Sequence, residues 1–129
     1  MKNVPLLTVN TAAIVANWQL LKALHGGRDT SAVVKANAYG LGVLPVSRAL
    51  WNAGCTQFFV ATLEEAIELR PALPKATLYV FQGLLKGEES DYLHYRLKPV
   101  LNTSTQIETW QHVSVNHPDA QAAAIHVDT

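Results

Sequence analysis

Hydrophobic residues are spaced in two alternating ways along this chain. Short apolar runs flanked by turn residues predict buried strands. They lie near residue 31 and at 57–61, 77–81, 98–101 and 122–127. Between them, apolar residues recur every three or four positions, which is the spacing of an amphipathic helix. The alternation, with strands roughly 20 to 25 residues apart, predicts βα units in a parallel sheet.

Capping residues predict where the first helix begins and ends. Asn10 or Thr8 can cap a helix that starts near Thr11 and stops at Gly26-Gly27. The residues on its apolar face are Ile14, Val15, Trp18, Leu21 and Leu24.

Later helices are predicted from the same signals. They lie at 43–51, 62–70, 88–95 and 103–113. The third of these is polar enough to be a short, exposed helix. Two begin with a capping box, Thr62 with Glu65 and Thr103 with Gln106. We interpret Glu64 and Glu65 as helix-initiating residues without a further role.

The composition is that of a globular protein without charge bias. The 129 residues include 10 Lys and Arg against 10 Asp and Glu, which gives no electrostatic reason to expect a nucleic acid or an anionic membrane as partner. The sequence has no run of ~18 apolar residues and no signal peptide. Cys55 is the single cysteine, so the chain suits a reducing compartment. We therefore expect a cytoplasmic protein.

The apolar run at 32–36 contains one lysine, Lys35. An ammonium at the end of a buried strand is costly unless it is paired or consumed in a covalent bond. Asn37, Gly40 and Gly42 predict a tight turn directly after it. The lysine therefore lies where a strand gives way to a loop, which is where α/β proteins position catalytic groups. On these arguments alone, a strand-end lysine that extends its ammonium into water is the alternative.

The run Val-Val-Lys-Ala-Asn-Ala-Tyr-Gly at 33–40 resembles the pyridoxal-phosphate attachment motif of bacterial alanine racemases. The resemblance implies a (β/α)8 TIM-type barrel in which Lys35, on the first strand, holds pyridoxal 5'-phosphate as a Schiff base and acts as a proton-transfer base. It also implies that Tyr39 lines the cofactor near its phosphate. Many relatives have His where this chain has Leu41, a position to which we assign no chemistry.

A complete barrel of this kind takes ~250 residues. We therefore expect residues 1–129 to be the N-terminal part of the barrel domain, with about the first five strands. The remaining barrel strands and the C-terminal β domain would lie outside this sequence. Alternation along the first strand should direct Lys35 and Val33 into the barrel, and Val34 and Ala36 outward against the helices.

A second stretch, 125–129, resembles the start of another motif of the family, in which Asp-Thr precedes Gly and then an arginine. Family members often carry a lysine, sometimes carbamylated, where this chain has His126. This departure puts the carbamate in doubt. His126 is then either an indirect support for the arginine, which lies beyond Thr129, or a polar strand-end residue.

Other candidate groups carry no recognisable chemistry. His25, His94, His112 and His117 are scattered, without a cysteine or carboxylate at ligand spacing. We expect surface histidines and no metal site. Cys55 follows a helix stop and has no basic neighbour in sequence, which predicts a packed, inert thiol.

The resemblance implies a racemase that interconverts L-alanine and D-alanine by a two-base mechanism and supplies D-alanine for cell-wall peptidoglycan. Lys35 would serve one face of the substrate. A tyrosine from the C-terminal domain of the second subunit of a homodimer, outside this chain, would serve the other. Two alternatives remain: a non-catalytic structural fragment of that enzyme, or another barrel-type pyridoxal-phosphate enzyme such as an amino-acid decarboxylase. We expect the 129 residues alone to be inactive.

Overall fold

Strands and helices alternate along the chain, as the apolar spacing predicts. The computed structural model of the protein describes residues 4–128. Its strands are β1 (Ala32–Val33), β2 (Gln57–Val60), β3 (Thr77–Val80), β4 (Lys98–Leu101) and β5 (Ala124–Ile125). Its helices are α1 (Thr11–Leu24), α2 (Lys35–Tyr39), α3 (Val43–Asn52), α4 (Leu63–Leu69), α5 (Glu89–His94) and α6 (Ser104–Asn116). None of the helices within 4–128 is long and apolar enough to cross a membrane.

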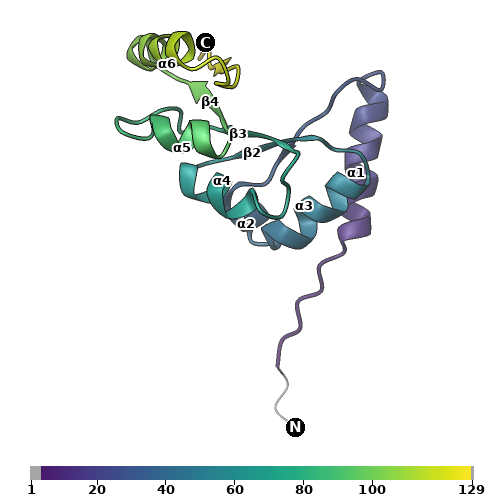
Figure 1. Cartoon of the computed structure of the whole chain (residues 1–129). Helices are drawn as coiled ribbons and strands as arrows, with labels where there is room; N and C mark the ends of the chain where they lie inside the picture. Colours follow the sequence, from purple (N-terminus) through teal and green to yellow (C-terminus); the bar gives the residue numbers. More distant parts are fainter. Residues whose placement is uncertain (1–3, 129) are drawn as a thin grey trace.

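The strands form one five-stranded parallel sheet in the order β1-β2-β3-β4-β5. Phe58 of β2 pairs with Ala32 of β1 and with Leu78 of β3, and Val80 pairs with Pro99 of β4. Each strand therefore lies beside the next one in sequence, which is the strand order of a (β/α)8 barrel. In Figure 1 the helices lie along an open arc that begins with α1 and α3 and ends with α5 and α6. The structure confirms the α/β fold and an arrangement of five barrel strands.

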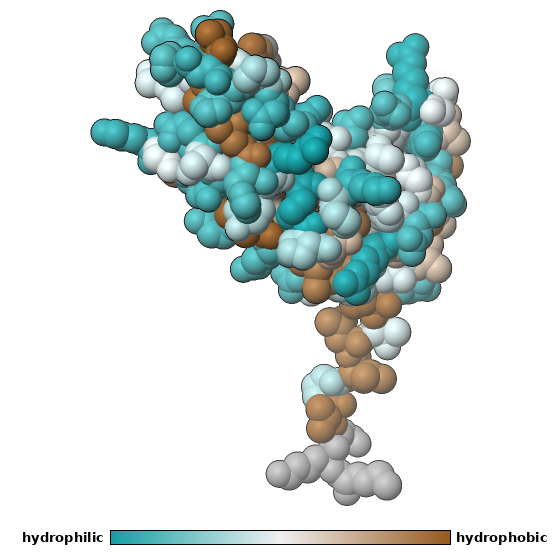
Figure 2. All heavy atoms as spheres, in the orientation of Figure 1, coloured by the Kyte–Doolittle hydropathy of each residue, from teal (hydrophilic) through white to brown (hydrophobic). Residues whose placement is uncertain are grey.

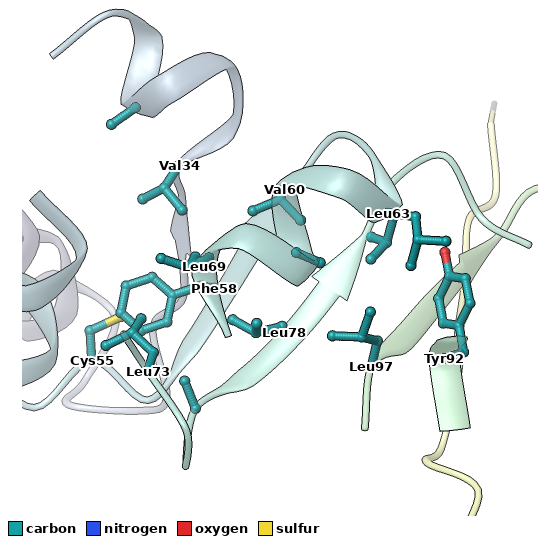
Figure 3. Packing of buried hydrophobic residues seen from close by; sticks show 14 of the residues in the cluster. Val34, Cys55, Phe58, Val60, Leu63, Leu69, Leu73, Leu78, Tyr92 and Leu97 are labelled. Atoms are coloured by element: carbon teal, nitrogen blue, oxygen red, sulfur yellow. The ribbon is translucent and has the colours of Figure 1, made fainter. Parts of the chain in front are cut away.

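The helix-covered face of the sheet forms the core. Phe58, Val60, Leu78 and Val80 are at most 1% exposed. Figure 3 shows Phe58, Val60 and Leu78 among side chains from the α4 region, namely Leu63, Leu69 and Leu73, and Val80 belongs to the same cluster. Burying one such side chain stabilises the fold by about 1.5–3 kcal/mol. The core therefore fixes which face of each strand turns toward the helices.

The opposite face of the sheet, here called the concave face, is open. Its residues are Val33, Phe59, Tyr79 and Phe81. Val33 is 42% exposed, whereas the next residue, Val34, is 2% exposed, which confirms their predicted inward and outward directions. The outward position predicted for Ala36 is wrong, because β1 ends at Val33 and the backbone leaves strand geometry after Lys35.

Helix α1 has the predicted N-cap, and its apolar face is only partly buried. The Asn10 side chain accepts a hydrogen bond from the Ala13 N–H at 3.0 Å, and Trp18 is buried. Leu21 and Leu24, however, are 58% and 76% exposed. Helix α1 packs on α3 and then extends past it (Figure 1). These two leucines are exposed because α3 does not reach the last turn of α1.

Helix α5 is not the fully exposed helix that its polar composition predicts. Tyr92 is completely buried, with its phenol donating to the Gly83 carbonyl. Its ring meets Trp110 of α6 edge-on, with centroids 5.9 Å apart. Burial, with a smaller contribution from the carboxylates of Glu88 and Glu64, raises the pKa of Tyr92 well above its ordinary value. One aromatic residue therefore anchors this polar segment.

The last strand is shorter than predicted. Residues 122–127 have the composition of a strand, but Ala124 and Ile125 alone form β5, paired with Val100 and Leu101 of β4. The prediction for Thr129 lies outside the described residues. The length of β5 is therefore set by the residues of β4 that pair with it and not by the length of the apolar run.

Candidate functional site

The carboxyl ends of the strands bring several polar side chains to one edge of the sheet. Lys35 follows β1, Asn102 follows β4 and His126 follows β5. In a barrel this edge carries the active site. Lys35 is half-buried, and its ammonium lies 5.8 Å from the centre of the Phe81 ring. The predicted direction of Lys35, toward the concave face, agrees with this contact.

Three aromatic rings of the concave face form what we call the aromatic row. Phe81 stacks on Phe59 at 5.0 Å between centroids, and Phe59 stacks on Tyr79 at 4.4 Å. A lysine ammonium lies over each end, Lys35 over Phe81 and Lys98 at 5.4 Å over Tyr79. Stacked pairs and cation–π contacts each contribute about 0.5–1.5 kcal/mol. The row is therefore a stack of three rings with Lys35 at one end and Lys98 at the other.

Our sequence interpretation missed the aromatic row. The signal was present, because Phe59, Tyr79 and Phe81 alternate with the buried residues of β2 and β3. What the sequence does not give is the register, which places Phe59 directly beside Tyr79.

The backbone after Lys35 forms a left-handed helical turn, α2, rather than the ordinary turn predicted at 37–42. Residues 36–39 have φ values of 51° to 55°. The Gly40 N–H donates to the Ala36 carbonyl at 3.0 Å, and the Gly42 N–H to the Asn37 carbonyl at 2.9 Å. Left-handed helical backbone costs roughly 1–2 kcal/mol per non-glycine residue. Contacts from outside the turn must offset this strain.

Three contacts fasten the left-handed turn. The Asn37 side chain accepts the Val43 N–H at 2.8 Å, which ties the turn to the start of α3. Ala38 is 4% exposed and belongs to the core. Glu65 accepts the Ala36 N–H at 2.9 Å through Oε1 and the Ala61 N–H at 2.7 Å through Oε2.

The function predicted for Glu65 is therefore incomplete. Thr62 does cap α4 as expected, since its side chain accepts the Glu65 N–H at 3.3 Å. The Glu65 carboxylate, however, reaches back past Thr62 to the end of β2 and across to α2, the turn that follows β1. Its second partner, Ala36, lies 29 residues away in sequence, so no local pattern could have revealed it.

Tyr39 is the last residue of the left-handed turn, with φ 55°. Its side chain is 63% exposed, and it lies four positions after Lys35 on the same turn. An exposed phenol can donate a hydrogen bond to an anionic oxygen while its ring packs against a ligand. Its contact with a cofactor phosphate stays a prediction.

Comparison with known proteins bears directly on this arrangement. The family model described as "Alanine racemase, N-terminal domain" matches residues 9–129. The alanine racemase of Methylobacterium sp. (strain 4-46) is 44% identical over 123 residues. The chain belongs to the alanine racemase family. The family assignment confirms the resemblance that the sequence carries at 33–40.

Solved alanine racemases share the fold of this chain. The Bartonella henselae enzyme, whose structure contains covalently bound pyridoxal phosphate, superposes with a TM-score of 0.81 at 38% identity, over 85% of this chain and 31% of that one. The biosynthetic alanine racemase of Pseudomonas aeruginosa gives 0.74 at 35% identity, over 81% and 29%. The Methylobacterium match covers 95% of this chain and 34% of its relative. The chain thus spans about a third of the length of the curated relatives it matches.

His126 belongs to a small hydrogen-bonded group at the same edge of the sheet. Its Nδ1 lies 2.9 Å from Oδ1 of Asn102. The Asn102 amide nitrogen donates to the carbonyls of Phe81 at 2.9 Å and Val100 at 3.0 Å. His126 is exposed, so Asn102 joins the ends of β3, β4 and β5 while the imidazole remains open to solvent.

The other histidines and the cysteine lie where the sequence predicts. His25, His94, His112 and His117 are all exposed. Within residues 4–128, no three His, Cys, Asp or Glu side chains cluster as metal ligands. Cys55 is completely buried, its thiol is 3.4 Å from the Gln57 carbonyl, and burial raises its pKa. This confirms a packed thiol, since a raised pKa disfavours the nucleophilic thiolate.

Proposed function

We propose that this chain supplies the lysine-bearing part of an alanine racemase, with pyridoxal 5'-phosphate bound covalently to Lys35. The position of Lys35 carries the proposal: it follows β1 at the carboxyl edge, faces the aromatic row and lies within the family motif at 33–40. The covalently bound pyridoxal phosphate of the Bartonella henselae relative supports it. Family membership favours this reaction over that of a barrel-type decarboxylase.

The residues around Lys35 fit a flat aldehyde that carries a phosphate. A primary amine condenses with an aldehyde, and the aromatic row offers an apolar wall beside that amine. The exposed phenol of Tyr39 supplies a donor for a phosphate oxygen. When bound, the cofactor would supply an electron sink for negative charge at the α-carbon of an amino acid.

The proposed reaction interconverts L-alanine and D-alanine. The Lys35 amine would remove the α-proton on one face of the substrate, or return it there. By resemblance, the base for the other face is a tyrosine from the C-terminal domain of the partner in a homodimer. We infer a cytoplasmic enzyme that supplies D-alanine for cell-wall peptidoglycan, with His126 supporting the site only indirectly.

Residues 1–129 would form the N-terminal part of the barrel domain, completed by further strands and a β domain. The openness of the concave face supports this, because Val33 is 42% exposed and Phe59 and Tyr79 are half-buried. We expect the 129 residues alone to be a non-catalytic piece. Appreciable D-alanine formation from L-alanine by this chain alone would contradict that expectation.

Covalent trapping tests the function of Lys35. The chain mixed with pyridoxal phosphate should develop an absorption band at the edge of the visible, and borohydride should fix the adduct on the peptide containing Lys35. Lys35→Ala should lose both signals. Lys98→Ala removes the ammonium at the other end of the aromatic row and is the matched control, which should keep them. Equal adduct yield in Lys35→Ala would overturn the proposal.

A further inference from the structure

We propose that Glu65 is a positioning residue for Lys35, acting through the left-handed turn. The inference rests on the proposed function only in the use that it assigns to Lys35. The Glu65 carboxylate lies between two strand ends and accepts the Ala36 N–H at 2.9 Å and the Ala61 N–H at 2.7 Å. Ala36 is bonded directly to Lys35 in sequence, so this contact fixes the peptide unit from which the lysine side chain departs.

A carboxylate suits this position because it has two acceptor oxygens and no donor. The two N–H groups come from different segments, one after β1 and one after β2. Hydrogen bonds to an ionised acceptor are shorter and stronger than those between neutral groups. A glutamine here would satisfy one N–H and point its own N–H2 group at the other.

The same chain shows a glutamine in the matching place. Gln106 follows Thr103 as Glu65 follows Thr62, and its Oε1 accepts the Asn102 N–H at 2.8 Å. Among the described residues, Gln106 accepts this one backbone N–H, and the positive-φ residue beside its side chain is a glycine, Gly83, rather than a run of non-glycine residues. The single acceptor oxygen of Gln106 is enough to hold the end of β4. Glu65 uses both carboxylate oxygens because it holds the end of β2 and also the turn after Lys35.

The turn needs this external contact because its backbone is unfavourable by itself. Four successive non-glycine residues, 36–39, have positive φ, a conformation that L-amino acids avoid. Without the bond to Glu65, the Ala36 peptide is free to rotate toward right-handed or extended backbone. The Lys35 side chain would then leave its place over Phe81.

The experiment compares Glu65→Gln with Gln106→Ala in this chain, without cofactor. Amide hydrogen exchange, resolved by NMR, should rise about ten- to a hundredfold at Ala36 in Glu65→Gln, which corresponds to losing one hydrogen bond to a charged group. In Gln106→Ala the rise should fall on Asn102 and leave Ala36 unchanged. Unchanged exchange at Ala36 in Glu65→Gln, whether or not exchange at Ala61 rises, would overturn the proposal.

The position of the lysine is measured in the same variants. The rate at which acetic anhydride acylates Lys35, relative to Lys98 in the same molecule, should change at least about threefold in Glu65→Gln and stay constant in Gln106→Ala. The rate at which the pyridoxal-phosphate adduct forms on Lys35, measured by borohydride trapping, should fall in Glu65→Gln and stay constant in Gln106→Ala. Faster exchange at Ala36 with an unchanged Lys35 rate would overturn positioning.

The outcomes separate this inference from the proposed function. If the unsubstituted chain forms no pyridoxal-phosphate adduct at Lys35, the proposed function fails, while amide exchange and acylation still test Glu65. Circular dichroism and thermal unfolding report on the fold of each variant. Loss of the folded state in Glu65→Gln would overturn the proposal too, because it would assign the carboxylate a general structural role.

Discussion

The β2–α4 and β4–α6 connections share one capping motif but differ in the contacts that it makes. In both, a threonine caps the helix, Thr62 at 3.3 Å and Thr103 at 3.2 Å from the backbone N–H that it accepts. In both, the side chain three positions later accepts the first backbone N–H after the strand, from Ala61 or from Asn102. Glu65 adds a bond across to Ala36 beside Lys35. A repeated capping motif has thus become part of the candidate site in one unit only.

Val100 of β4 and Gln106 of α6 pack closely around Gly83, where we expect the largest effect of a substitution. A Cβ added at Gly83 would lie 2.8 Å from the Val100 carbonyl oxygen and closer still to the Gln106 side chain, at φ +78°. Gly83→Ala should therefore lower the free energy of unfolding by about 2–4 kcal/mol, measured by urea denaturation. Gly87→Ala is the control, because Gly87 has φ +91° but open space around its Cβ. Gly87→Ala should lower the free energy of unfolding by about 1 kcal/mol. Equal losses for Gly83→Ala and Gly87→Ala would contradict the explanation by crowding around Gly83.

The second-largest effect on stability is expected at Tyr92, whose buried phenol donates a hydrogen bond to the Gly83 carbonyl. Tyr92→Phe removes the donor and leaves the Gly83 carbonyl, a buried group, without that hydrogen bond. We expect a loss of about 1–3 kcal/mol in the free energy of unfolding. Tyr39→Phe, at an exposed phenol, should change stability by less than about 0.5 kcal/mol. A neutral result for Tyr92→Phe would mean that the contact contributes nothing net.

Tyr92 also predicts a dependence of stability on alkaline pH. Its pKa in the folded chain is raised, chiefly by burial, whereas a tyrosine in the unfolded chain ionises near pH 10. The stabilising contribution is therefore complete below about pH 10 and is lost as the pH rises above it, by up to about 1.4 kcal/mol per pH unit. Unfolding curves of the parent chain and Tyr92→Phe at pH 8 to 11 measure it. Parallel pH profiles would contradict the prediction.

The two N-caps should behave alike despite their different surroundings. Thr62→Ala and Thr103→Ala each remove one side-chain acceptor from a helix N-terminus, so each should lower stability by about 1 kcal/mol. The difference should appear in amide exchange at Ala36. Thr62→Ala should speed that exchange, because Thr62 caps the backbone N–H of Glu65 and Glu65 holds the Ala36 N–H. Thr103→Ala should leave it unchanged. A similar response to both would remove the distinction between the units.

Local patterns were sufficient for the strands, the caps and the lysine. The apolar runs predicted β2, β3 and β4 within a residue of their observed bounds. The sequence motif at 33–40 predicted Lys35 at the end of a strand. These features depend on neighbours in sequence. The pairing of β5 and the exposure of Leu24 depend on how far a partner element extends, which the sequence of one element does not contain.

The left-handed turn shows why the rest of the site could not be predicted. Ala36, Ala38 and Tyr39 have no preference for positive φ, and Asn37 alone tolerates it well. The conformation is supported by Glu65, 29 residues away, and by the burial of Ala38. A nonlocal hydrogen bond overrides local propensity at the position next to the functional lysine, which agrees with strain being concentrated at functional sites.

The smallest predicted effect tests whether the two units are interchangeable. Gln106→Glu keeps an acceptor for the Asn102 N–H and adds negative charge in the first turn of α6, which the helix dipole favours by about 0.3–1 kcal/mol. We expect it to be neutral or stabilising by up to about 0.5 kcal/mol, whereas Glu65→Gln breaks one of two bonds and should destabilise. Urea denaturation of both variants gives the comparison. If Gln106→Glu lost as much stability as Glu65→Gln, the requirement for a carboxylate would be a property of the capping motif and not of the turn beside Lys35.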